Sequence, residues 1–76
     1  MTTATNAQLR LVVTEVHRGE HVAQVGNLPD VVGTEWERIG ELRSLAEAEV
    51  LRAYPDARIT GAATADDHTY LIWFRF

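Results

Sequence analysis

The sequence predicts an α+β fold, in which a four-stranded, mainly antiparallel sheet carries one amphipathic helix on one face. Two patterns lead to this prediction. Four short segments alternate apolar and polar side chains, which is typical of strands that bury one face. The segment between the second and the third of them instead repeats its apolar residues at helical spacing. The expected order of elements is therefore β-β-α-β-β.

The chain of 76 residues is long enough for one domain. Residues 8–76 are expected to form that single α+β domain, and residues 1–7, which are small and polar, to form a disordered or frayed tail. A domain of this size buries only about 60% of the surface that its unfolded chain exposes, so its stability is small. Because the sequence has no cysteine, neither disulfides nor thiolate metal sites reinforce it.

A β-hairpin is expected at the start of the domain, with strands over residues 8–16 and 21–26. The residues between these strands read His-Arg-Gly-Glu, and the glycine suits a tight turn. One face of the first strand is continuously apolar. The opposite face still carries Val12 and Val16, so neither face of this strand is cleanly polar.

Residues 34–54 are expected to form one long helix. Thr34 and Glu37 match a capping box at its start, and Pro55 marks its end. The composition, which is rich in Glu, Leu, Arg and Ala, also favours a helix. The apolar residues that fall in one helical arc are Trp36, Ile39, Leu42, Ala46, Val50 and Ala53.

A second interpretation of this segment places an extra strand over residues 35–42, before a shorter helix. It would keep Gly40 out of a helix interior, where glycine costs about 1 kcal/mol. Ser44 and Glu47 would then form the capping box of the shorter helix. Against the strand, Ile39 would share its face with three glutamates. The long helix is therefore the favoured interpretation, and the strand stays open as the alternative.

Two further strands are expected over residues 57–64 and 69–76, joined by a turn at residues 65–68. The last strand is the most apolar segment of the chain. Its residues on one face are Tyr70, Ile72, Phe74 and Phe76, and its apolar residues on the other face are Leu71 and Trp73. One helix covers only one face of a sheet. If it covers the first set, Leu71 and Trp73 are left beside Val12 and Val16 as an apolar patch of the kind that marks an interface, and the reverse arrangement leaves the first set outside. The alternative is that strand twist and the N-terminal tail or residues 26–33 cover this face within the monomer.

Acidic residues outnumber basic ones by 11 to 7, and the whole net charge of −4 lies within residues 30–49. Such an acidic segment repels phosphates, so direct nucleic-acid binding is disfavoured. Carboxylates along a helix instead suit a partner protein with a basic surface. Tryptophan and arginine are enriched among the residues that dominate interfaces. The expected partner-binding residues are Glu37, Glu41, Glu47, Glu49, Trp36, Arg43, Leu71 and Trp73.

No group of residues points to catalysis, to a metal or to a cofactor. Residues 17–21 match the H-x-x-E-H spelling of inverted zinc peptidases, but those enzymes carry the motif on a helix, and here a hairpin is expected. Across that hairpin, His17 and His21 could still hold a metal incidentally. Asp66 and Asp67 suit turn geometry better than acid–base chemistry. We therefore expect a protein without enzymatic activity and without a resident metal or cofactor.

Two short stretches resemble parts of known families. Residues 21–38 have His-Val-Ala-Gln-Val before Asn-Leu-Pro, and then Gly-Thr opening a helix. They are similar to the N-terminal part of HicB-type antitoxins, although Asp30 and Arg38 replace the glycine and the alanine usual there. Residues 38–48 are similar to the strand–helix unit of peptidoglycan-binding SPOR domains. Neither stretch is specific enough to imply a function.

The sequence therefore predicts a small, acidic interaction protein that masks the surface of a protein partner. A stoichiometric inhibitor or regulator, such as a phage-type anti-CRISPR or an antitoxin-like protein, would suit this description by analogy. The alternative is a homodimeric ligand-binding or scaffolding module. The first residues lack the charged start and apolar core of a signal peptide, and no apolar run is long enough to span a membrane. The expected location is the cytoplasm.

Overall fold

The computed structural model describes residues 9–76 and has the expected order of elements. The tail expected at residues 1–7 lies outside the described residues. The strands and the helix are β1 (Arg10–His17), β2 (Glu20–Gly26), α1 (Glu35–Ala53), β3 (Arg58–Asp66) and β4 (Thr69–Arg75).

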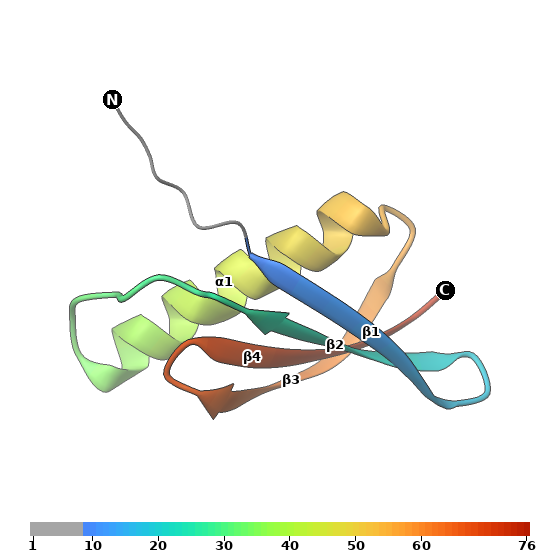
Figure 1. Cartoon of the computed structure of the whole chain (residues 1–76), viewed down its shortest axis with the longest axis horizontal. Coiled ribbons are helices and arrows are strands. Elements are labelled where there is room, and N and C mark those ends of the chain that lie inside the picture. The colour runs from blue at the N-terminus through green and yellow to red at the C-terminus, as the bar shows by residue number, and fades with distance from the viewer. Residues whose placement is uncertain (1–8) are drawn as a thin grey trace.

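The four strands form one antiparallel sheet in the order β1-β2-β4-β3. β1 and β2 form one hairpin, β3 and β4 form another, and the pairing of β2 with β4 joins the two hairpins at the centre of the sheet. Figure 1 shows α1 running along one side of this sheet. The predicted α+β fold, with one sheet and one helix, is therefore confirmed.

Short turns close both hairpins. The β1–β2 turn contains Gly19, whose φ of 75° lies in the left-handed region that favours glycine. In the β3–β4 turn, the backbone N–H of His68 donates to the Asp66 carboxylate at 2.8 Å. The hairpin predicted from the His-Arg-Gly-Glu sequence is therefore confirmed.

The interpretation of residues 34–54 as one long helix is confirmed. The strand considered over residues 35–42 is wrong, because α1 spans these residues. The Glu37 N–H donates to the Thr34 hydroxyl at 3.2 Å, and the Thr34 N–H donates to the Glu37 carboxylate at 2.9 Å, which completes the predicted capping box. Gly40 lies inside the helix at an exposed position, with open space where a side chain would lie, so its cost of about 1 kcal/mol does not prevent the helix from forming.

The core lies between α1 and the side of the sheet that faces it. Its buried residues are Ala23, Val25, Leu28, Leu42, Ala46, Val50, Tyr70, Ile72 and Phe74. The apolar arc of the helix is not buried at its two ends, where Trp36 is 83% exposed and Ala53 is also exposed. The buried residues of α1 all lie between Leu42 and Val50, so only the middle of the helix packs fully against the sheet.

An aromatic cluster surrounds Phe74 at the end of the core. The rings of His21 and Tyr54 stack against Phe74, with centroids at 5.3 Å and 5.5 Å. Phe76 has the place on the core side that the alternation predicts, and its ring meets Phe74 edge-on at 5.6 Å. It is nevertheless 62% exposed, so it forms the rim of the cluster and not part of the core.

Phe74→Ala is expected to lower the free energy of unfolding by about 3–5 kcal/mol, because it leaves a cavity beneath α1. Phe76→Ala removes the same ring from a mostly exposed position and is expected to cost no more than about 1 kcal/mol. Urea unfolding followed by far-UV circular dichroism compares the two variants. Equal losses would contradict the different places that the two rings have in the fold.

Candidate functional site

The two faces of the sheet differ in their surroundings. One face packs against α1, whereas no helix or strand lies over the other face in the part of the chain that the structure describes. We name this second surface the outer face. Cα partners on paired strands share a face, so the register gives its rows. The outer face consists of Val12, Gln24, Leu71 and Ala63 in one row and of Thr14, Val22, Trp73 and Gly61 in the next.

Leu71 and Trp73, two of the predicted partner-binding residues, lie at the centre of the outer face. The indole of Trp73 packs across Gly61, since a Cβ placed on Gly61 would lie 3.8 Å from Trp73 Cε3. Leu71 and Trp73 are half-buried by their neighbours on the sheet. Val12, in the same row as Leu71, is 49% exposed. The outer face thus has half-buried apolar side chains at its centre, with Val12 and the polar residues Gln24 and Thr14 exposed beside them.

Three arginines border the outer face. Arg75 is the next residue after Trp73 on the outer side of β4, and its Cα partner on β3 is Arg58. Arg10 lies at the other end of the face, on β1. Glu20, on β2, is the partner of Arg75 on its other side. None of the three arginines forms an ion pair with another described residue, so three guanidinium groups stand against one carboxylate on this surface.

Two of the glutamates predicted to contact a partner are instead paired within α1. Glu47 accepts a hydrogen bond from Arg43 at 2.7 Å, and Glu49 accepts one from Arg52 at 2.7 Å. The bond from Arg52 holds the pKa of Glu49 below its usual value. Arg43, predicted as an interface anchor, therefore already has a partner in its own helix.

The other predicted residues of α1 gather in its N-terminal half. Glu37 is exposed but serves the capping box, whereas Glu41 is exposed and forms no ion pair with another described residue. Trp36 is 83% exposed, and Val32, in the loop just before the helix, is 95% exposed. This end of α1 is a second candidate surface, with apolar side chains among carboxylates.

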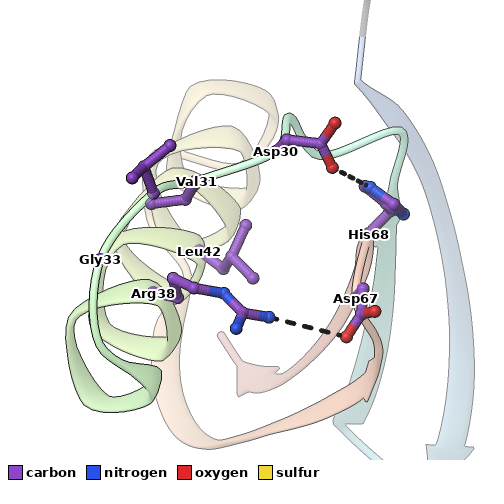
Figure 2. Close-up of a pocket in the computed structure, with 8 residues that line it drawn as sticks. Asp30, Val31, Gly33, Arg38, Leu42, Asp67 and His68 are labelled. Carbon is purple, nitrogen blue, oxygen red and sulfur yellow. Dashed lines mark hydrogen bonds and ion pairs between the residues drawn. The ribbon is translucent and has the colours of Figure 1, made fainter.

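A pocket of about 330 Å³ lies between the loop that precedes α1 and the β3–β4 turn (Figure 2). Two pairs bridge it: His68 Nε2 lies 2.6 Å from Asp30 Oδ1, and the guanidinium of Arg38 lies 3.8 Å from the Asp67 carboxylate. The Leu28 N–H also donates to the His68 carbonyl at 3.0 Å. The polar groups of the pocket thus join the loop and the first turn of α1 to the β3–β4 turn, which is a structural role.

Charges near His68 set its protonation. The hydrogen bond with Asp30 raises the pKa of His68, and the Asp67 and Asp66 carboxylates act in the same direction. The backbone N–H of His68 in turn lowers the pKa of Asp66. The imidazolium form of His68 is therefore favoured by the acidic groups that face it.

The structure brings no three metal-ligating side chains together among residues 9–76. His17 and His21 lie on opposite faces of the sheet. His17 is the Cα partner of Glu20, which lies on the outer face, whereas the ring of His21 stacks on Phe74 at the edge of the core. The buried Nδ1 of His21 has no hydrogen-bond partner among the described residues.

The three arginines of the outer face are not among the residues that the sequence analysis selects. Arg10 lies two residues before Val12, and Arg75 lies two residues after Trp73, so strand alternation places each of these arginines on the same face as its apolar neighbour. This spacing is a signal in the sequence that could identify Arg10 and Arg75. Arg58 has no such signal, because a register shift follows it in β3 and breaks the alternation.

Comparison with protein families, with curated proteins and with solved structures finds no match to this chain. The resemblance to SPOR domains also conflicts with the fold, because α1 runs unbroken through residues 38–48. The described residues contain no helix that is long and apolar enough to cross a membrane. Function is therefore inferred from the surfaces of the molecule.

Asp30→Asn is expected to return the pKa of His68 toward its ordinary value of about 6.5. Because folding raises this pKa, the His68–Asp30 pair stabilises the protein below about pH 6.5 and loses its effect as the pH rises through the folded-state pKa. NMR titration of the imidazole and unfolding curves on both sides of that pH measure the change. Asp56→Asn is the control, since Asp56 does not contribute to the pKa of His68. An unchanged His68 pKa in Asp30→Asn would contradict the contact.

Proposed function

We propose that this chain is a non-catalytic interaction protein, which binds a protein partner and masks a surface of that partner. The observation that carries the proposal is the open outer face, where Val12, Leu71 and Trp73 lie without a covering layer in the described part of the chain. Exposed apolar patches on small proteins usually mark interaction sites. A protein that works in this way acts in stoichiometric amounts, as an inhibitor or regulator of its partner.

Covering the apolar side chains of the outer face would contribute favourably to binding. Burying about 400 Å² of apolar surface contributes roughly 10 kcal/mol before the costs of association. Trp73 and the bordering arginines belong to the residue types that dominate measured interfaces. Because these side chains project from a hydrogen-bonded sheet, little backbone ordering is needed when the partner binds.

The N-terminal half of α1 is the second contact surface that we consider, and it would suit a basic partner. Trp36 and Glu41 support it, because both are exposed and neither belongs to the core or to an ion pair of the described residues. The internal pairing of Glu47 and Glu49 lowers the acidic charge that α1 can offer. The outer face is therefore the preferred contact surface.

Leu71→Lys is expected to abolish capture of the protein partner from a lysate of the source cells, because it places a charge at the centre of the contact. Glu41→Lys, which changes α1 instead, is expected to keep the capture. Mass spectrometry of the proteins that a tagged chain retains measures both, after circular dichroism has shown that each variant is folded. If only Glu41→Lys loses the partner, the contact lies on α1. If the wild-type chain retains no protein, the proposal is refuted.

The competing function is a homodimeric scaffolding or ligand-binding module, in which a second copy covers the same apolar face. Analytical ultracentrifugation of the wild-type chain and of Leu71→Lys separates the two functions. We expect a monomer for both chains. A wild-type dimer that Leu71→Lys dissociates would favour the competing function instead.

A further inference from the structure

We infer that the outer face is built for an acidic protein segment, which places apolar side chains on Leu71 and Trp73 and carboxylates beside Arg58 and Arg75. This inference rests on the proposed protein-binding function and adds the chemistry of the partner. It reverses the expectation from composition, in which an acidic chain seeks a basic partner. The reason lies in how the fold distributes its charges.

Apart from Arg18 in the β1–β2 turn, the arginines of the chain fall into two groups. Those of α1, which are Arg38, Arg43 and Arg52, each pair with a carboxylate of the chain at 3.8, 2.7 and 2.7 Å. Those of the strands, Arg10, Arg58 and Arg75, form no ion pair with a described residue. Positive charge is therefore neutralised on the helix side and left free on the outer face.

The arrangement of Arg58 and Arg75 is the strongest sign of a missing anionic group. They are direct Cα partners on β3 and β4, and like charges placed opposite each other destabilise a sheet. Glu20 adjoins Arg75 from β2, but Arg58 lies at the sheet edge and has no acidic neighbour across the strands. A carboxylate from outside would satisfy both guanidinium groups, for which bidentate pairing is well suited.

Other parts of this chain do not provide that carboxylate. Residues 1–8 contain no acidic residue. A second copy packed outer face to outer face would bring arginines toward arginines, and this like-charge contact disfavours the dimer. A separate acidic protein segment is therefore the occupant that the charges favour.

A protein segment fits this surface better than a nucleic acid. The arginines flank Val12, Leu71 and Trp73, which offer apolar area to aliphatic side chains. The net charge of −4 also repels a phosphate backbone at longer range.

The experiment selects binders from a phage-displayed library of random peptides on the immobilised full chain. Selected peptides are then synthesised, and their affinities are measured for the wild-type chain, Arg58→Glu and Arg18→Glu. Arg18 is an exposed arginine of the β1–β2 turn without an ion pair among the described residues, so its reversal changes the net charge equally. Arg58→Glu removes a like-charge pair and is therefore not expected to unfold the chain.

We expect the selected peptides to be enriched in Asp, Glu and aliphatic residues. Arg58→Glu should weaken them by about tenfold or more, and Arg18→Glu should change their affinity by less than about twofold. Their affinity should also fall as the salt concentration rises. A single-stranded oligothymidine serves as the nucleic-acid probe and should bind at least about tenfold more weakly than the peptides.

Three results would overturn the inference. Peptides enriched in Lys and Arg that Trp36→Ala weakens, but Arg58→Glu does not, would keep the protein-binding function and move its site to α1. Tighter binding of the oligothymidine, lost in Arg58→Glu, would replace the protein partner by a nucleic acid. A library that yields no specific binder would refute both the acidic partner and the proposed function.

Discussion

The packing of β4 against α1 is the contact on which the rest of the molecule depends. β4 bonds to a strand on each side, and its inward side chains form the largest part of the buried core beneath the helix. Because side chains alternate along a strand, the same segment must present Leu71 and Trp73 on its other side. The helix is already used on the first side. An apolar outer face is therefore a direct result of how the core is built.

The fold also separates charges that the sequence mixes. The helix side carries most of the carboxylates, and two of them, Glu47 and Glu49, are neutralised by arginines one turn away. The strands carry fewer charges, but those on the outer face are mainly arginines without partners among the described residues. A protein with a net charge of −4 thus presents a positively charged border around its apolar surface. The net charge indicates a basic partner, whereas the arginines around the outer face indicate an acidic one.

Local patterns in the sequence were enough to predict the elements and their order, but not their mutual placement. The start of the helix could be predicted from the capping box of Thr34 and Glu37, because its two hydrogen bonds join residues only three positions apart and so depend on local sequence alone. The exposure of Trp36 depends on how far the sheet extends beneath α1, which periodicity does not contain. Likewise, the neighbourhood of Arg58 and Arg75 depends on the register of two strands and on a register shift in β3. Such long-range geometry is set by packing.

The strand order has a consequence for how the chain assembles. Each hairpin closes through a tight turn, so its pairing needs only local sequence, whereas the β2–β4 pairing joins segments that α1 separates. The entropy lost on closing this long loop grows only slowly with its length, and isolated hairpins are at best marginally stable in water. The two halves of the sheet therefore become stable together, when α1 docks across them. We therefore expect this small domain to fold cooperatively, with the β2–β4 pairing formed as α1 docks.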